Sequence, residues 1–345
     1  MSSARFHHRD PSPPLPNPLP RRGGEGTCED EQFMHFNLSD RSQLELTGND
    51  RARFLHGFCT NDIKGLQPGG GCEAFVCNVQ GKVLGHIFVF CTESALWIDT
   101  VPGQEDGLFA HLDRYLINEN VQIHKRTTEF GEIYVDLESA ADIARLLGIA
   151  DADEAFPAAL LSHVTLTYEG SMIHIRRVDW LGEPGWLISG PQAVLDQLLS
   201  TFPEPLAENW DALRIAAGFP HYGRDITSEN LAQEVNRTAR AISFKKGCYL
   251  GQEPIARIDA LGHVNRELHR LEIIGSAVPA AGTPLLDPQA GTQVGVITSA
   301  AAKSAGMVVA LGYLRTKFCS AGSQVAISIN SGSATATVLA DLPPC

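Results

Sequence analysis

The sequence lacks the signals of several common classes of protein. It contains no Cys-x-x-Cys motif and no paired cysteine spacing of the zinc type, so its eight cysteines build no complete four-cysteine metal or cluster site by any local motif. No apolar run is long enough to suggest a membrane span, and no apolar segment of a secretion signal follows the N-terminus. We see no internal repeat. We therefore expect a cytoplasmic protein that makes no contact with membranes.

Basic residues are also in short supply. The chain has 27 Lys and Arg against 40 Asp and Glu, a net charge of −13. Phosphate backbones select basic surfaces, so this balance argues against a general binder of nucleic acid or membrane surfaces. Residues 237–270 reverse the balance, with seven Lys or Arg against three acids. This local excess of +4 suits an anionic ligand, although a solvated helical face would show the same pattern.

The length of 345 residues leaves room for two or three domains. Residues 1–33 are rich in proline and have almost no apolar periodicity, so we predict a disordered tail. Met34 stands directly before the first plausible strand, and we hypothesise that it is the real start of the protein. Mass spectrometry of the native N-terminus tests this hypothesis, and peptides covering residues 5–30 would refute it.

Apolar periodicity and turn residues divide the remaining chain into four segments, 34–130, 131–208, 209–265 and 266–345. In the first segment we predict strands at 43–47, 75–79, 83–90, 95–100 and 121–124, a short helix capped by Asp50, and a helix over 108–116. The second segment predicts a ferredoxin-like α+β unit, with strands at 132–137, 165–168, 172–177 and 185–189 and helices at 139–147 and 191–199.

The third and fourth segments differ from each other in character. Residues 210–217 predict a helix that stops at Gly218, and a second helix runs from Pro254 to a stop at Gly262. After Gly262 the chain has short β-rich runs broken by glycine and proline, which indicate a small β-barrel or sandwich.

The densest chemistry lies in Lys246-Gly247-Cys248-Tyr249-Leu250-Gly251-Gln252-Glu253. Lys245 and Lys246 stand next to the thiol, and nearby cations favour a thiolate, as does the start of the helix that follows. The glycines permit a sharp turn and a close approach to a ligand. The residues alone leave three roles open for Cys248: a nucleophile, a metal ligand, or a small buried cysteine in a glycine turn.

This motif resembles the signature of the YgfZ family, the folate-binding relatives of the glycine cleavage T-protein that support iron–sulfur cluster proteins. Further stretches that match the family are Gly48-Asn49-Asp50, Thr60-Asn61-Asp62-Ile63, Gly182-Glu183-Pro184-Gly185-Trp186, Leu213-Arg214-Ile215 and Val294-Gly295-Val296-Ile297-Thr298-Ser299. The resemblance covers residues 36–340.

The resemblance implies an α+β, T-protein-like ring of three domains with a central tetrahydrofolate pocket and a C-terminal β-barrel. It implies that Glu183 and Arg214 face the folate, since a carboxylate accepts from the pterin and a guanidinium pairs with a glutamate tail. Each also has an ordinary interpretation, a hairpin turn for Glu183 and cover of the helix face for Arg214. Within the motif we assign Cys248, Lys246 and Tyr249 to the reactive site. The remaining motif residues assigned to the folate are Gly251, Gln252 and Glu253.

One departure from the family pattern separates the two branches of the superfamily. Aminomethyltransferases carry an aspartate pair where this chain has Gly85 and His86, and their chemistry needs a carboxylate near the folate nitrogen. His86 is either a titrating replacement or a packed strand residue. The loss of the acid favours an accessory factor over an aminomethyl or one-carbon transferase.

Three readings of the function therefore remain. The first is a tetrahydrofolate-binding factor for iron–sulfur cluster assembly or repair that uses Cys248 as a cluster ligand or redox thiol and works with iron–sulfur proteins or assembly factors. The second is a folate-dependent one-carbon transferase, and the third is a tRNA-binding factor. We expect a monomer with no direct contact to nucleic acid.

Overall fold

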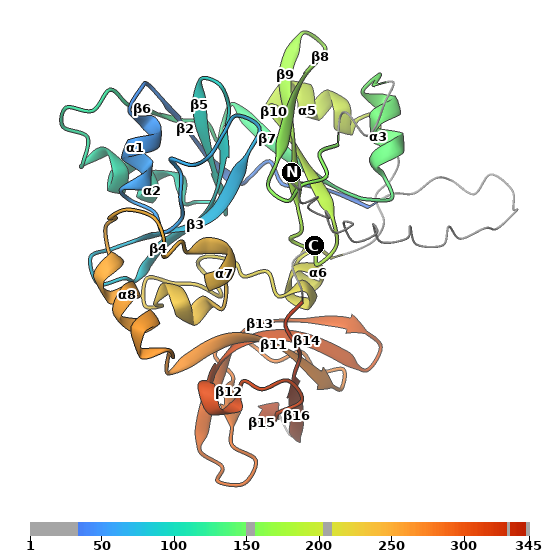
Figure 1. Cartoon of the computed structure of the whole chain (residues 1–345). Coiled ribbons are helices and arrows are strands. Elements are labelled where there is room, and N and C mark those ends of the chain that lie inside the picture. The colour runs from blue at the N-terminus through green and yellow to red at the C-terminus, as the bar shows by residue number, and fades with distance from the viewer. Residues whose placement is uncertain (1–33, 150–155, 203–208, 330–331, 343–345) are drawn as a thin grey trace, which may run out of the picture. The chain divides into compact units, whose positions relative to one another are not determined.

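The computed structural model describes residues 34–149, 156–202, 209–329 and 332–342. The predicted tail and the hypothesis on Met34 as a start concern residues 1–33, which lie outside this range. Residues 32–345 belong to one compact unit, whose strands form two antiparallel five-stranded sheets and one closed barrel (Figure 1). No helix in the described residues has the length and apolar character needed to cross a membrane.

The first sheet has the strand order β3-β4-β5-β2-β6. Its strands are β2 (Ser42–Thr47), β3 (Gly71–Cys77), β4 (Val83–Cys91), β5 (Ala95–Thr100) and β6 (Gln122–Lys125). Helices α1 (Arg51–His56) and α2 (Glu105–Asp113) pack on it through Phe54, Leu55, Leu108 and Leu112. Every predicted strand and helix of this segment is confirmed within a few residues, because apolar side chains recur here at the period of each element.

The cap predicted for α1 is wrong. Asp50 occupies the N-cap position, but its side chain makes no capping hydrogen bond. Its Oδ2 instead accepts from the backbone N–H of Asn120 at 3.0 Å. The carboxylate therefore ties the start of α1 to the turn before β6.

The second sheet has the order β1-β7-β10-β9-β8, and all its neighbouring strands are antiparallel. Its elements are β1 (His35–Asn37), β7 (Phe130–Asp136), α3 (Ala140–Leu146), β8 (His163–Tyr168), β9 (Ser171–Val178), β10 (Gly185–Pro191) and α5 (Gln192–Leu199). The predicted α+β content is confirmed. The topology differs from a ferredoxin-like unit, because β8, β9 and β10 form a simple meander with no helix between β9 and β10. Strand β1, whose residues fall in the first predicted segment, pairs with β7 at the sheet edge.

A buried network of ion pairs links the two sheets. Arg41 Nε donates to Asp99 Oδ1 of β5 at 2.9 Å and to Glu132 Oε2 of β7 at 3.2 Å. Arg176 of β9 donates to the other oxygen of Glu132 at 2.7 Å. Because all four side chains are buried, removal of one would leave an uncompensated charge in the interior.

The remaining helices lead to the barrel. They are α6 (Trp210–Ala217), the 3₁₀ turn η1 (Ala232–Val235), α7 (Thr238–Ala241) and α8 (Gln252–Leu261). The barrel closes in the order β11-β14-β13-β12-β15-β16. Its elements are β11 (Arg266–Ile274), β12 (Pro284–Leu286), β13 (Gln293–Ser304), β14 (Met307–Arg315), the 3₁₀ turn η2 (Thr316–Phe318), β15 (Gln324–Ile329) and β16 (Gly332–Val338). The barrel prediction is confirmed, as is the helix over 210–217 with Gly218 in the left-handed region.

Candidate functional site

The motif loop, residues 246–251, exposes the Cys248 side chain and buries neighbouring side chains. Among the described cysteines Cys248 alone is exposed, whereas Lys246 and Tyr249 are buried. The Lys246 ammonium donates to the backbone carbonyls of His56, Cys59 and Asn61 at 2.5–3.0 Å and lies 4.7 Å from the centre of the Tyr249 ring. Lys246 therefore fastens the loop to residues 56–61, which is a structural task that the sequence pattern did not indicate.

Burial shifts the pKa of both inward-pointing groups. It lowers the pKa of Lys246 despite the nearby Cys59 and Asp62, which raise it. Burial also raises the pKa of Tyr249 well above its usual range, so the phenol stays neutral at every physiological pH. The reactive roles assigned to Lys246 and Tyr249 remain predictions, and the contacts described here are those of loop anchors.

The backbone conformation at Gly251 and the close approach of Asn78 require glycine at this position, whether or not a ligand binds. Its φ of 83° is in the left-handed region, and a Cβ there would collide with the carbonyl oxygen of Asn78. Helix α8 begins at the next residue and ends at Gly262, as predicted from Pro254 and the two glycines. In the first turn of α8, Gln252 is half-buried and Glu253 is exposed.

A cavity of about 400 Å³ lies away from the motif residues. It is bounded by the end of β9 and the turn after it, the end of α6, η1, α7 and strand β11, and neither Cys248 nor the Gly251–Glu253 stretch lines it. Aromatic, basic and acidic side chains all contribute to its wall, among them Trp180, Phe219, Arg237, Arg240, His269 and Asp341.

The aromatic part of the wall is closely packed and contains one donor without a partner among the described residues. The rings of Trp180 and Phe219 stack with their centres 5.0 Å apart and their planes 15° apart. Trp180 Nε1 is buried and has no hydrogen-bond partner among the described residues. Because Trp180 is only 1% exposed, a ligand acceptor could reach this N–H only if the surrounding side chains moved.

The cationic part of the wall is held by buried acids. Arg237 donates through Nε and Nη2 to both oxygens of Glu73, which is 1% exposed. Its Nη1 makes no hydrogen bond within the described residues. Arg240 forms a two-pronged pair with Asp179 at 2.7 and 2.8 Å. Part of the basic excess of residues 237–270 is thus paired with buried acids inside the fold.

Glu73 also contacts the histidine at the position that separates the two branches. His86 Nε2 lies 2.7 Å from Glu73 Oε1, and the imidazole is 2% exposed. Burial would raise the pKa of Glu73, but Arg237 and His86 outweigh it and hold this pKa well below its usual range. Burial lowers the pKa of His86. A carboxylate therefore lies next to His86 of β4 after all, but it belongs to Glu73 of β3 and is already bonded to Arg237 and His86.

The two residues predicted to face the folate are placed differently. Arg214 is 1% exposed and donates to Asp211, Phe219, Asp225 and Ser299, at 2.6–3.2 Å. Its guanidinium thereby joins α6, the following turn and barrel strand β13, and the structure does not present it to a ligand.

Glu183 is exposed, next to Gly182 on the cavity wall. Asp225 accepts from His221 N–H at 2.9 Å, as expected of a turn residue.

Sequence reasoning missed Glu73 and the role of Arg237. One signal was available: Glu73 is a lone acid in the apolar run of β3, and an acid in a buried strand is normally paired. Its partner stands 164 positions later, so nothing local identifies it.

Comparison with known proteins agrees with this architecture. The family described as GCVT N-terminal domain matches residues 30–246. A chloroplast protein of Arabidopsis thaliana, named as a transferase, is 24% identical over 305 residues, covering 86% of this chain and 69% of that protein. The tRNA-modifying protein YgfZ of Yersinia pestis is 27% identical over 264 residues, covering 72% of this chain and 74% of that protein. The tRNA-modifying protein YgfZ of Blochmanniella pennsylvanica is 28% identical over 270 residues, covering 74% of this chain and 77% of that protein.

A solved structure extends the likeness to the whole fold. The glycine cleavage system aminomethyltransferase T from Bartonella henselae superposes with a TM-score of 0.77 at 19% identity, covering 90% of this chain and 85% of that one. At this identity the match shows the fold alone. Together with the family match over most of the chain, it establishes that the chain belongs to the GCVT N-terminal domain family, with a YgfZ/GcvT-like fold.

Proposed function

We propose that the chain is a tetrahydrofolate-binding accessory protein that supports the assembly or repair of iron–sulfur proteins, including tRNA-modifying enzymes, through the Cys248 thiol. The observation that carries this proposal is the exposure of Cys248 on a loop anchored by buried neighbours on both sides. A thiolate is a preferred ligand for iron–sulfur clusters, but one thiol is an incomplete ligand set. A partner protein or a small thiol must therefore supply the rest.

We place the folate in the 400 Å³ cavity. Its volume lies within the roughly 300–1,000 Å³ typical of small-molecule sites. Arg237 Nη1 and Arg240 suit the carboxylates of the glutamate tail. These two arginines replace Arg214 in that role. When bound, tetrahydrofolate supplies ring nitrogens that carry a one-carbon unit.

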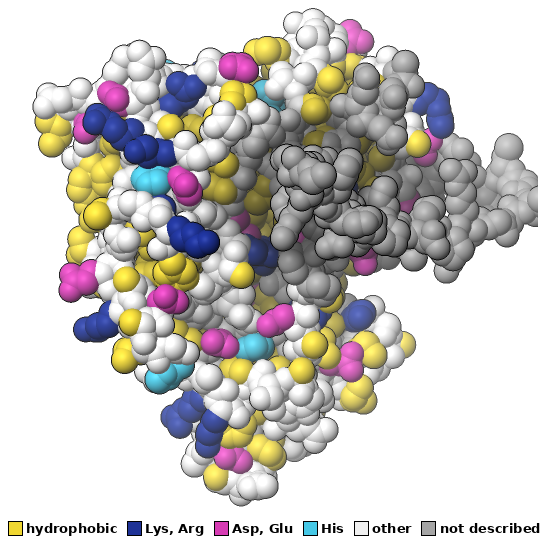
Figure 2. All heavy atoms as spheres, in the orientation of Figure 1, with side chains coloured by type: hydrophobic (Ala, Val, Ile, Leu, Met, Phe, Trp, Pro, Cys, Tyr) yellow, Lys and Arg dark blue, Asp and Glu magenta, His cyan; other side chains and the backbone are white. Residues whose placement is uncertain are grey.

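The surface supports an indirect link to tRNA. Lys and Arg side chains are interspersed with Asp and Glu over the described part of the face in Figure 2 and do not merge into a single basic field. With a net charge of −13, such a surface is a poor match for a phosphate backbone. We therefore assign the tRNA connection, which the names of the Yersinia and Blochmanniella relatives carry, to enzymes that this protein supports.

A titration with tetrahydrofolate tests the cavity assignment. Arg237→Lys keeps a cation beside Glu73 but removes the planar fork, so we expect binding at least tenfold weaker than in wild type. Folate analogues without the glutamate tail should bind wild type and variant equally. Arg145→Lys, which alters an exposed arginine, is the control and should bind as wild type does. Absence of folate binding by wild type would remove this part of the proposal.

The alternative, a one-carbon transferase, requires a base that reaches the folate. Glu73 and His86 are buried, are bonded to each other and do not line the cavity, which favours the accessory role. Incubation with tetrahydrofolate and dimethylamine-like donors should therefore yield no transfer. Turnover that is lost in His86→Gln would establish the transferase instead.

A further inference from the structure

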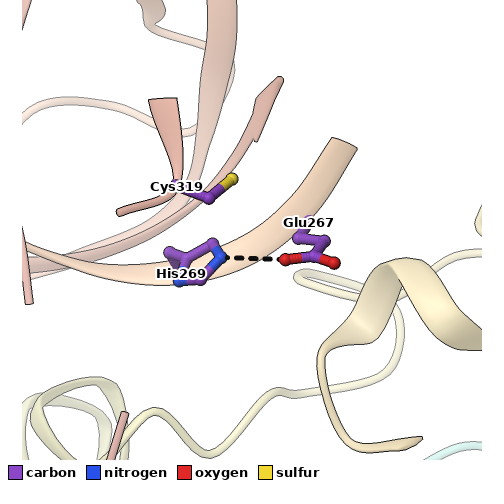
Figure 3. Close-up of side chains that lie close together, drawn as sticks. All are labelled: Glu267, His269 and Cys319. Atoms are coloured by element: carbon purple, nitrogen blue, oxygen red, sulfur yellow. Dashed lines mark hydrogen bonds and ion pairs between the residues drawn. The ribbon is translucent and has the colours of Figure 1, made fainter. Parts of the chain in front are cut away.

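Three side chains with metal-ligating atoms meet at one end of the barrel. Glu267 and His269 stand two residues apart on β11 and therefore share a face of the strand, and Cys319 directly follows η2. One ligand atom from each lies within 4.8 Å of the other two. In Figure 3 the His269 nitrogen bonded to Glu267 and the sulfur of Cys319 lie on the same side of the ring. None of these residues belongs to the motif loop.

We propose that Glu267, His269 and Cys319 form a binding site for a borderline-soft divalent cation such as Zn²⁺, with a fourth position open to water or to a ligand. Thiolate, imidazole and carboxylate together are typical zinc donors, and three protein ligands with one open position are typical of sites that do chemistry.

The separations fit tetrahedral coordination. With metal-ligand distances of about 2.0–2.3 Å, neighbouring N and O ligands should lie roughly 3.4 Å apart, and a sulfur should lie roughly 3.6 Å from either. His269 Nε2 and Glu267 Oε2 are already 3.3 Å apart. The sulfur has to approach by no more than about 1.2 Å, which a rotation of the Cys319 side chain can supply.

The second nitrogen of His269 lies near a carboxylate without a hydrogen bond to it. Nδ1 is buried with no hydrogen bond in the described residues, and Asp341 Oδ1 lies 3.9 Å away. A shift of Asp341 by about 1 Å would bring this carboxylate into the position that orients a metal-bound imidazole and strengthens it as a donor. His269 and Asp341 also line the 400 Å³ cavity, so the cation would stand directly behind the cavity wall.

Binding costs the thiol its proton. Without metal, Cys319 Sγ lies 3.5 Å from the carbonyl oxygens of Leu314 and Arg315, at the distance of weak S–H hydrogen bonds. On binding, the S–H bond of Cys319 breaks and the sulfur electron pair forms the bond to the cation. His269 Nε2 also gives up the proton that it shares with Glu267, so that its lone pair can bind the cation, and both protons are released to solvent. No electron is transferred in this step.

Cobalt provides a direct probe of the site. Protein treated with a chelator and titrated with Co²⁺ should take up one equivalent and develop a thiolate-to-cobalt charge-transfer band with visible bands of tetrahedral intensity. Zn²⁺ should displace the cobalt and bleach these bands. Cys319→Ser should lose the charge-transfer band. Glu267→Gln, a change at a half-buried side chain that the fold tolerates, should keep the band but bind at least about tenfold more weakly.

The control separates this site from the motif thiol. Cys248→Ser should bind Co²⁺ with wild-type affinity and spectrum. The proposal is overturned if wild type shows no charge-transfer band, if Cys319→Ser retains it, or if Cys248→Ser abolishes it. None of these outcomes depends on the function proposed for Cys248.

Discussion

Replacement of Arg237 by Ala should destabilise the protein strongly and in a pH-dependent way. Glu73 is 1% exposed and the Arg237 side chain is 13% exposed, so the pair is buried. Removal of Arg237 leaves the buried Glu73 carboxylate with His86 as its remaining partner, and breaking a buried pair costs roughly 3–5 kcal/mol in free energy of unfolding. Arg145→Ala is the matched control. Its guanidinium is 71% exposed and pairs with Asp142 one helical turn away, so the loss should be roughly 0.3–0.5 kcal/mol.

The pH dependence follows from the pKa of Glu73. In wild type this pKa lies below the value in the unfolded chain, so the stabilisation is complete above about pH 4.3 and is lost only as the pH falls further. Without Arg237, burial becomes the dominant influence and raises the pKa of Glu73 above the unfolded value. The variant then binds a proton on folding, and its deficit relative to wild type should shrink as the pH falls from 7 toward 5.

Urea denaturation at pH 7 and pH 5 measures both effects, with the unfolding free energies of wild type, Arg237→Ala and Arg145→Ala compared at each pH. A loss below about 1 kcal/mol for Arg237→Ala at pH 7 would contradict the assignment of a buried ion pair. An equal loss at both pH values would contradict the predicted direction of the pKa change at Glu73.

Three further predictions concern the loop and the second sheet. Gly251→Ala should lower the free energy of unfolding, measured by urea denaturation, by more than about 2 kcal/mol, because the new Cβ meets the Asn78 carbonyl at a positive φ. The control Gly262→Ala has a similar φ but lies in open space, so it should cost about 1 kcal/mol. Equal losses would contradict the close contact at Gly251. Lys246→Met should lower the free energy of unfolding by roughly 2–4 kcal/mol because three buried carbonyls lose a charged donor, and a neutral result would show that the loop is not anchored there. Burial lowers the pKa of His163 to about 4 and that of His174 to about 3, so each stays neutral in the folded chain near neutral pH. Because the unfolded chain binds protons at these residues below about pH 6.5, the free energy of unfolding should fall as the pH drops from about 6.5 toward 4. A His163→Gln, His174→Gln double variant should make this pH dependence less steep.

Local rules predicted most of the fold. Helix α8 illustrates the reason: Gly251, Pro254 and Gly262 each act within one turn of the backbone, so their positions alone define where the helix begins and ends. The barrel was predictable for the same reason, from short apolar runs separated by glycine and proline. The same reasoning failed for Asp50, because its competing partner Asn120 is 70 positions away.

The candidate site depends on contacts that no local pattern encodes. Lys246 was assigned to the thiol because the two are close in sequence, yet its ammonium binds carbonyls that lie more than 180 positions earlier. Arg214 was assigned to the folate by resemblance, whereas Asp225 and Ser299 occupy its guanidinium. The exposure of Cys248 also depends on which of its neighbours the fold buries, and that is a property of the packed structure.

The central claim is that Cys248 is the working group of an iron–sulfur accessory protein. The most direct measurement is the activity of an iron–sulfur tRNA-thiolating enzyme in a strain that lacks this gene and is complemented with wild type or Cys248→Ala at equal protein levels. Because Cys248 is exposed and makes no packing contribution to the core, the variant should fold normally. Wild type should restore the enzyme, whereas Cys248→Ala should leave it at the level of the deletion strain. Full restoration by Cys248→Ala would contradict a working role for this thiol.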